Sequence, residues 1–260
     1  MNQQIKKYFI SAYLAHKEER VFTLEFLMSL FLIIFQTVIY WLVFNNILTL
    51  GSALSPRELL QYYVIMNLVT LSILPAQYVA YEHQEAINSG AIILDIMRPL
   101  CPIWSRFFNK LMSFAVRLCV YLLFILLAQV IIPSAFQISS LLWGSWSCFC
   151  GFVILYLLQA LLGALSVWLR DVSRIRDVLI YDMALILGGQ LFPSGHLVSW
   201  LKHAVYYTPF PYIYDVPTTI FQGHFSPNRL LGQIFWIVLL GALYLSTMKT
   251  RVLSQIDYGA

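Results

Sequence analysis

Residues 140–167 read SLLWGSWSCFCGFVILYLLQALLGALSV, a stretch without a charged side chain. A helix rises about 1.5 Å per residue, so about 20 residues match the roughly 30 Å hydrocarbon core of a bilayer. Five further stretches are apolar enough and long enough to do the same, at about 22–47, 58–81, 104–132, 176–192 and 229–249. The sequence therefore predicts an all-α integral membrane protein with six transmembrane helices.

The composition agrees with this fold class. Of 260 residues, 60% are hydrophobic and only 11% are charged, whereas soluble domains carry about 25% charged residues. The net charge of +4 comes from positive residues in short loops that flank the spans and not from one basic tract. Loop charges of this kind set membrane topology, so we expect no nucleic-acid partner.

Lys and Arg gather in every second gap between the predicted spans. Arg57, Lys202 and Arg229 lie on the side with few positive residues, and Arg117 lies inside a span. The other side holds twelve, namely Lys6, Lys7, Lys17, Arg20, Arg98, Arg106, Lys110, Arg170, Arg174, Arg176, Lys249 and Arg251. Because cytoplasmic loops carry the excess of Lys and Arg, both termini of this multi-pass chain are predicted to be cytoplasmic.

The first twenty residues precede the spans and have a helical pattern of their own. One stripe contains Ile5, Phe9 and Tyr13, while Lys6 and Lys17 lie elsewhere on the helix. This pattern favours an amphipathic helix over 1–20 that lies in the membrane interface. The alternative is a frayed polar leader. In either case 21–260 forms the six-span domain.

The cytoplasmic gap between the second and third spans contains a short predicted helix at about 85–97. Its Ile87, Ile92 and Ile96 can share one face, and Pro99 would stop it. We therefore expect this helix to lie outside the membrane.

The external gap between the fifth and sixth spans is apolar and aromatic, yet Gly and Pro interrupt it repeatedly from Gly188 to Gly223. Irregular backbone at membrane depth is tolerated only where protein or a cavity surrounds it. We expect re-entrant or interfacial helices over about 193–225 that cap the external end of a passage; the alternative is an aromatic belt that only anchors the protein. The gate candidates are Phe192, Pro193, Trp200, Tyr207, Pro209 and Phe210.

Charged residues within spans are costly, at about 2.5–3.5 kcal/mol near a helix centre, and each is a functional candidate. Arg117 lies near the middle of the third span, where it is predicted to face protein or a wet cavity. Glu25 and Asp182 lie nearer the cytoplasmic ends of their spans. For Arg117 a structural ion pair and a contact with substrate both remain open.

Enzyme chemistry finds no support in the sequence. No H-E-x-x-H, G-x-S-x-G or G-x-x-x-x-G-K-[ST] motif is present, so neither an intramembrane hydrolase nor an ATPase site is predicted. Cys101, Cys119, Cys148 and Cys150 form no C-x-x-C pair and have no histidines at ligand spacing, so we expect no metal and no disulfide framework. We therefore expect the chain to bind no cofactor itself.

The chain resembles the permease subunits of ABC-2-type exporters, in particular an uncharacterised bacterial branch of them. The resemblance covers nearly the whole length through the order of amphipathic helix, two spans, coupling helix, three spans, re-entrant segment and last span. The local motifs are Ile87-x-x-Gly90, Arg98-Pro99-Leu100, Gly188-Gly189, Phe192-Pro193 and Thr208-Pro209-Phe210, with Pro217 and Gly223 downstream.

The resemblance implies an exporter of the bacterial cytoplasmic membrane. Its pathway would form with a second permease, either another copy or a related chain, and separate ATPase subunits would bind ATP and Mg. The helix at 85–97 would dock in a groove of the ATPase, with Glu85, Ile87, Gly90, Asp95, Arg98 and Pro99 as the coupling residues. The cargo would be an amphipathic small molecule, peptide or lipid.

An ATP-independent channel or secondary transporter is the alternative function. A secondary transporter would be expected to have inverted repeats and paired broken helices near the bilayer midplane. The sequence has one break, at Gly188-Gly189, and no matching break in its first half. This observation favours the exporter subunit.

Overall fold

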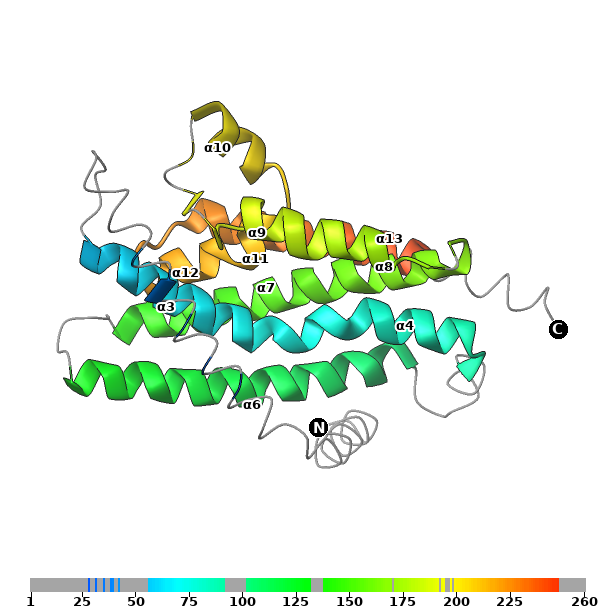
Figure 1. Cartoon of the computed structure of the whole chain (residues 1–260), viewed down its shortest axis with the longest axis horizontal. Helices are drawn as coiled ribbons and strands as arrows, with labels where there is room; N and C mark the ends of the chain where they lie inside the picture. The colour runs from blue at the N-terminus through cyan, green and yellow to red at the C-terminus, as the bar shows by residue number, and fades with distance from the viewer. Residues whose placement is uncertain are drawn as a thin grey trace.

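The structure is a computed structural model that describes 56–91, 102–131, 138–169, 171–191 and 193–247 without 195, 196 and 198, together with six single residues between 28 and 42. Throughout these ranges the regular structure is helical (Figure 1). Of the predicted first span, only the six single residues are described; all are helical and exposed. The predicted helix over 1–20 and Glu25 lie outside the described residues.

The long helices form a bundle in which their axes run roughly parallel or antiparallel to one another (Figure 1). The long elements are α3 (Pro56–Ile73), η1 (Leu74–Tyr78), α4 (Val79–Asn88), α6 (Pro102–Ile131), α7 (Ile138–Ala164) and α13 (Pro227–Thr247). The short ones are η2 (Leu165–Val167), α8 (Ser173–Arg176), the π-helix η3 (Asp177–Asp182), α9 (Met183–Leu187), α10 (Ser199–Tyr206), α11 (Phe210–Ile213) and α12 (Asp215–Phe221).

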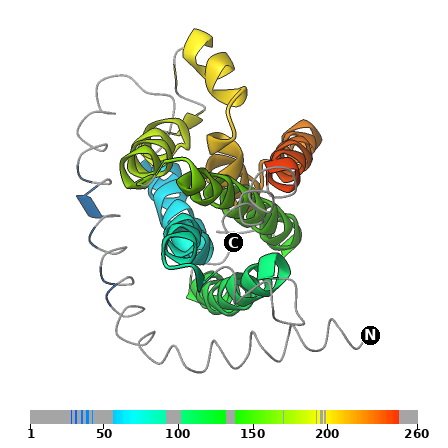
Figure 2. The same ribbon diagram turned by 90° about the vertical axis from the view of Figure 1, so that its right-hand side faces the viewer.

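The described helices alternate in direction between two ends of the bundle. We call them the Asp215 end, where Tyr62 contacts Asp215, and the Glu82 end, where Lys110 contacts Glu82. The α3–η1–α4 rod, α7 and α13 run from the Asp215 end to the Glu82 end, while α6 and α8–α9 run back (Figure 1). Helix α7 packs against the rod, α6, α11, α12 and α13, which makes it the central helix of this part of the chain (Figure 2).

Small residues on α7 allow this close packing. A Cβ atom on Gly151 would lie 2.6 Å from the carbonyl oxygen of Ile213, and one on Gly163 would lie 2.5 Å from Cβ of His83. Real Cβ atoms do not approach so closely without a shift in one neighbour. Glycine on α7 therefore sets the distances to α11 and α4.

Three described helices are long and apolar enough to cross a membrane: Glu58–Asn88 with 31 residues, Ser139–Ala164 with 26 and Pro227–Thr247 with 21. They correspond to the predicted second, fourth and sixth spans. Helix α6, with 30 residues, occupies the position of the predicted third span. The presence of six spans therefore stays a prediction.

The fifth predicted span differs from the structure. It was expected over 176–192, but α8, η3 and α9 together end at Leu187. Gly188 and Gly189 end the helix, since Gly189 has a φ of +83° that side chains other than glycine rarely adopt. At about 1.5 Å per residue, the 173–187 helix is shorter than a hydrocarbon core of about 30 Å.

The first half of the helix predicted at 85–97 is not a separate helix in the structure. Glu85 and Ile87 belong to α4, which continues the second span without a break and ends at Asn88. The chain then turns at Gly90, with a φ of +72°, and Ala91 is helical again. The later part, with Asp95, Arg98 and Pro99, lies outside the described residues.

Candidate functional site under the short-helix cap

The short-helix cap, which we define as residues 199–221, closes the Asp215 end of the bundle. Its α11 and α12 are buried and pack against α3, α7 and α9. In contrast, α10 projects from the bundle (Figure 1). Short helices therefore occur within the segment expected to be irregular at 193–225; that they are re-entrant or interfacial stays a prediction.

The five described gate candidates do not lie together. Phe210 is buried within the bundle, whereas the side chains of Trp200 and Tyr207 are 72% and 83% exposed. Pro193 and Pro209 are partly buried, and Phe192 lies outside the described residues. Within this subunit, Trp200 and Tyr207 line no interior passage.

A buried polar group joins the cap to the rod, with the Asp215 side chain at its centre. One carboxylate oxygen of Asp215, Oδ1, lies 2.9 Å from the Tyr62 hydroxyl, and the other, Oδ2, lies 2.5 Å from the Ser194 hydroxyl. The Tyr62 hydroxyl is also 2.9 Å from the carbonyl oxygen of Gly189. The Ser194 hydroxyl is 2.8 Å from the side-chain hydroxyl of Tyr206. Tyr62 on α3 and residues from the segment between Gly189 and Asp215 therefore meet around one carboxyl group.

Glycines bring the turn after α9 close enough to join this group. A Cβ atom on Gly189 would lie 2.8 Å from the Tyr62 hydroxyl and 3.0 Å from Cβ of Asp215, and one on Gly188 would lie 2.9 Å from the Tyr214 ring. The positive φ at Gly189 points its carbonyl toward the Tyr62 hydroxyl. Both glycines therefore shape the site directly.

Tyr206 lies between the Asp215 site and the guanidinium of Arg229. The guanidinium of Arg229 lies over the Tyr206 ring, 5.4 Å from its centroid, and donates to the Thr219 hydroxyl at 3.1 Å. Burial raises the pKa of Tyr206 above its ordinary value of 10.0. Tyr206 therefore keeps its hydroxyl proton at neutral pH and can donate it to Ser194.

A second polar junction fixes α11 between α7 and α13. The Gln233 amide nitrogen donates to the backbone oxygens of Tyr212 at 2.8 Å and Ser147 at 3.0 Å. The Ser147 hydroxyl donates in return to the Gln233 amide oxygen at 3.0 Å. Gln233 is fully buried, and its amide holds the base of the cap to two long helices.

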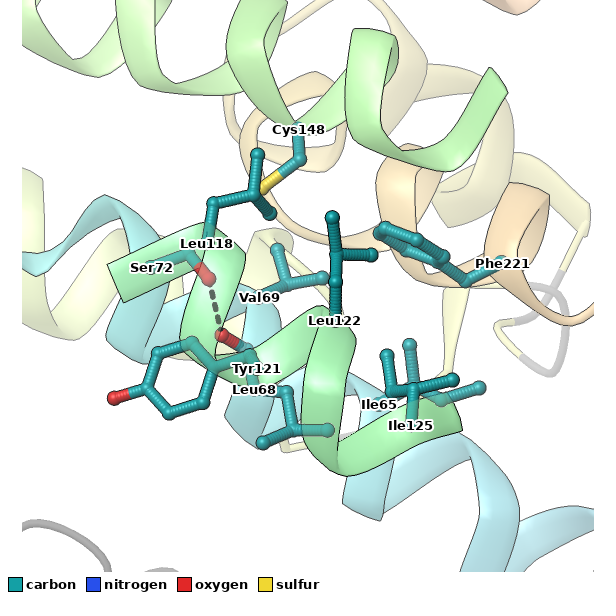
Figure 3. Close-up of a pocket in the computed structure, with 10 residues that line it drawn as sticks. All are labelled: Ile65, Leu68, Val69, Ser72, Leu118, Tyr121, Leu122, Ile125, Cys148 and Phe221. Atoms are coloured by element: carbon teal, nitrogen blue, oxygen red, sulfur yellow. Dashed lines mark hydrogen bonds between the residues drawn. The ribbon is translucent and has the colours of Figure 1, made fainter. Parts of the chain in front are cut away.

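A narrow pocket lies next to the cap, between α3, α6, α7 and α12 (Figure 3). The Ser72 hydroxyl at its edge donates to Leu68 within its own helix, at 2.9 Å, and the Tyr121 hydroxyl points away from the other lining side chains. The lining residues are Ile65, Leu68, Val69, Ser72, Leu118, Tyr121, Leu122, Ile125, Cys148 and Phe221. The pocket thus offers apolar contact and no site for a charged ligand.

At the Glu82 end, polar contacts tie the rod to α6 and α13. Lys110 forms an ion pair with Glu82. The buried His83 lies 2.9 Å from the carbonyl oxygen of Val79 through Nδ1 and 3.4 Å from the Tyr244 hydroxyl through Nε2. Since a carbonyl only accepts, Nδ1 carries a proton, and a neutral ring then accepts from Tyr244.

The predicted coupling residues that the structure describes lie just beyond these contacts. Glu85 is exposed, Ile87 is half-buried, and a Cβ atom on Gly90 would meet open space. They occupy the last turn of α4 and the turn after it. Glu85 is therefore accessible from outside the described bundle.

The intramembrane candidates have different surroundings. Arg117 on α6 is 8% exposed, one helical turn before the buried Tyr121. The expectation that it faces protein or a wet cavity stays a prediction, as do the structural and substrate-binding roles considered for it. Asp182 is exposed at the end of the π-helix, a kind of segment that is frequent at functional sites.

The central residues of the site, Asp215, Tyr62 and Ser194, were not among the sequence candidates. One signal was present, because Asp215 is an isolated acid within an aromatic, proline-rich apolar segment. Its partners cannot be read from the sequence, since Tyr62 lies 153 residues away.

Neither the site nor the comparisons identify a cofactor or a family. No cluster of His, Cys, Asp and Glu side chains suited to a metal ion occurs among the described residues. The sequence matches no family model and no curated protein.

Proposed function

We propose that this chain is the transmembrane permease subunit of an ATP-driven exporter in the bacterial cytoplasmic membrane. It would form the pathway with a second permease and draw energy from separate ATPase subunits. The observation that carries this proposal is the Glu58–Asn88 helix, whose 31 residues span about 46 Å at 1.5 Å each. A bilayer core of about 30 Å cannot contain that length, so one polar end projects from it.

The projecting end is the Glu82 end in this proposal. Glu85 and Asn88 are exposed there. Four of the described basic residues, Arg106, Lys110, Arg174 and Arg176, lie at the same end of the bundle (Figure 1). Excess positive charge marks the cytoplasmic side. The last turn of α4 would therefore meet an ATPase in the cytoplasm.

The rod also supplies a mechanical connection between the two ends. Near its start Tyr62 contacts Asp215 in the cap, and near its finish Glu82 pairs with Lys110 on α6. Packed helices shift as rigid bodies more readily than they deform. Movement of the Glu82 end by an ATPase would thus displace the cap and open or close the pathway.

The cargo proposed for this pathway is an amphipathic small molecule, peptide or lipid. Support comes from the apolar character of the cap and its adjoining pocket, which offer few fixed charges for an inorganic ion. Cargo would pass between two permeases.

Charge reversal at the two ends of the rod tests the coupling. Both Glu58 and Glu85 are exposed. The chain is expressed with a candidate ATPase subunit, and Glu85→Lys is expected to reduce co-purification and transport-linked ATP hydrolysis at least tenfold. The matched control Glu58→Lys is expected to leave both within twofold of the wild-type values.

The outcomes separate this proposal from the alternative function. Equal losses of ATPase co-purification and ATP hydrolysis in the two variants would contradict the proposal that the end of α4 contacts the ATPase. A stable chain that associates with no ATPase, yet conducts ions or exchanges solutes in vesicles, would favour a channel or secondary transporter.

A further inference from the structure

We propose that α10 and the first turn of α13 bind the headgroup phosphate of a membrane phospholipid at the Asp215 end of the bundle. Lys202 and Arg229 supply the positive charge, and the exposed face of α10 rests in the interfacial layer of the bilayer. Three observations carry this inference: the position of α10, the residues on its exposed face, and the two cations beside Tyr206. The inference does not rest on the proposed function, because a channel with the same helices would meet the same lipid.

Helix α10 lies at the level where a candidate membrane span begins. Both views of the bundle show it projecting sideways and not along the bundle axis (Figures 1 and 2). The guanidinium of Arg229 lies 5.4 Å from the centroid of the Tyr206 ring, and Arg229 belongs to the first turn of α13, which is long and apolar enough to cross a membrane. The end of such a helix marks the boundary between hydrocarbon and headgroups. Contact with Arg229 therefore places α10 at that boundary.

One face of α10 carries residues suited to this boundary. Trp200, His203, Ala204 and Tyr207 are all exposed, and residues three, four and seven positions apart share one side of a helix. The N–H of Tyr207 donates to the carbonyl oxygen of Ala204 at 3.2 Å, so the turn continues to Tyr207. Trp and Tyr concentrate at the headgroup level because their apolar rings carry a polar group.

Exposed aromatic side chains occur at the same level on neighbouring elements. Phe225 lies two residues before α13, and its ring centroid is 5.0 Å from that of Trp143 on α7. Both side chains are exposed. The aromatic face of α10 therefore belongs to a layer of aromatic residues at the start of α13.

Two cations lie beside Tyr206. Lys202 precedes Tyr206 by four residues, which makes the two side chains neighbours on α10. Arg229 lies over the Tyr206 ring and donates to the Thr219 hydroxyl at 3.1 Å, which holds the guanidinium next to α10. Lys and Arg bind phosphate oxygens through charge-assisted hydrogen bonds. Two of the three basic residues predicted on the external side are thus placed to bind one phosphate group.

The size and chemistry of this surface favour a lipid over a protein partner. Trp200 and Tyr207 offer about 150–250 Å² each, roughly half of the about 800 Å² that one partner buries in a standard protein interface. A phospholipid needs no such area, because the bilayer surrounds the helix. Its phosphate is complementary in charge to Lys202 and Arg229.

Tyr206 connects the lipid-binding helix to the buried part of the short-helix cap. Its hydroxyl lies 2.8 Å from that of Ser194, which in turn contacts Asp215. Helices α11 and α12 are buried in the bundle. The phospholipid therefore holds one side of the cap at the membrane surface while the other side stays packed against the bundle.

Spin-label accessibility of the full chain in lipid nanodiscs tests the position of α10. In a cysteine-free background, nitroxides are attached at Ala204→Cys and at two exposed reference positions, Val238→Cys within α13 and His224→Cys before it. At Ala204 the accessibility to oxygen and to a water-soluble nickel chelate is expected to lie between the two references. A match to His224 would place α10 in water, a match to Val238 would place it in hydrocarbon, and access by neither reagent would place it against protein. Each of these three outcomes would overturn the proposal.

Native mass spectrometry with added phosphatidylglycerol tests the phosphate contact. Lys202→Gln is expected to weaken binding of the tightest-held phosphatidylglycerol about fivefold, the effect of one cation at an anionic lipid surface. The matched control Lys202→Arg keeps the charge and is expected to bind as the wild type does. Lys202 is chosen because substitution of Arg229 would also remove its contacts with Tyr206 and Thr219.

The same experiment identifies the source of the phosphate. Diacylglycerol, which has no phosphate, is expected to be retained less than phosphatidylglycerol, and inorganic phosphate at equal concentration is expected not to displace the lipid. Equal retention of the two lipids, or equal binding by wild type and Lys202→Gln, would contradict the phosphate contact. Displacement by inorganic phosphate would assign the site to a free anion and overturn the lipid as its occupant.

Discussion

Gly189 combines a backbone requirement with a packing requirement. Its φ of +83° lies in the left-handed region, and the space where a side chain would begin is filled by Tyr62 and Asp215. Gly223 has a similar φ of +94°, but a Cβ atom there would meet open space. Substitutions at Gly189 and Gly223 therefore distinguish the free-energy cost of a positive φ from that of a steric clash.

We expect Gly223→Ala to lower the free energy of unfolding by about 1–2 kcal/mol, the cost of a left-handed conformation. Gly189→Ala is expected to cost distinctly more, because its Cβ would also displace the Tyr62 hydroxyl. Thermal unfolding in detergent, followed by tryptophan fluorescence, measures both variants. Equal losses would show that the Tyr62 contact does not restrict Gly189.

Asp171 illustrates how a local hydrogen bond controls an exposed carboxyl. The backbone N–H of Ser173 donates to it at 2.8 Å, and this bond lowers the pKa of Asp171 below 3.8, with smaller contributions from the Ser173 hydroxyl and Gln84. The lowered pKa means that the bond stabilises the start of α8 above pH 3.8. That contribution is lost as the pH falls through the lower, folded-state pKa.

An NMR titration of ¹³C-labelled aspartate is therefore expected to give Asp171 a midpoint below 3.8. Ser173→Ala should move that midpoint only part of the way back, because the backbone N–H remains. A midpoint unchanged from 3.8 in the wild-type protein would contradict the hydrogen bond.

At the scale of elements, α7 acts as the common packing surface. Its tightly packed glycines are not interchangeable with glycines whose surroundings leave room for a Cβ atom. Gly151 would place a Cβ 2.6 Å from the backbone of Ile213, whereas Gly241 on α13 would place one 3.8 Å from the Leu157 side chain. The same substitution therefore has opposite expected effects at the two positions.

Gly151→Ala is expected to destabilise the protein by about 1–3 kcal/mol, since overpacking must push α11 away from α7. Gly241→Ala should be neutral or stabilising by up to about 1 kcal/mol through helix propensity. Unfolding in detergent gives both values. A stabilised Gly151→Ala variant would contradict the close approach of α11.

At the scale of the whole molecule, the two ends of the bundle define a topology. The C-terminal end of α4 and the start of α8 lie at one end of the bundle, and the start of α13 lies at the other end with the cap (Figure 1). In the proposed orientation the first group is cytoplasmic. Exposed positions at each end make this arrangement measurable.

Single cysteines placed in a cysteine-free background test the topology. Asn88→Cys and Arg174→Cys are expected to react with an impermeant maleimide only in inside-out vesicles. His224→Cys and Asn228→Cys are expected to react only in right-side-out vesicles. All four positions are exposed, so reaction of one pair from both sides would contradict the alternation of helices.

The sequence by itself determined the helical elements that depend on local composition. The stretch predicted at 140–167 is α7 at Ile138–Ala164, and the stretch predicted at 229–249 is α13 at Pro227–Thr247. Length and apolarity are properties of consecutive residues, so no knowledge of partners was needed. Gly188 and Gly189 were visible as an interruption, yet the fifth span was predicted to run past them to 192, whereas α9 ends at Leu187.

Only the tertiary structure decided where the polar residues meet and where the second span ends. Helix α4 continues to Asn88 because α7 packs along it and Lys110 on α6 pairs with Glu82. The Tyr62–Asp215 contact bridges 153 residues. Such contacts depend on the three-dimensional packing of distant helices, and a periodicity read along one segment carries no information about the segment that it will face.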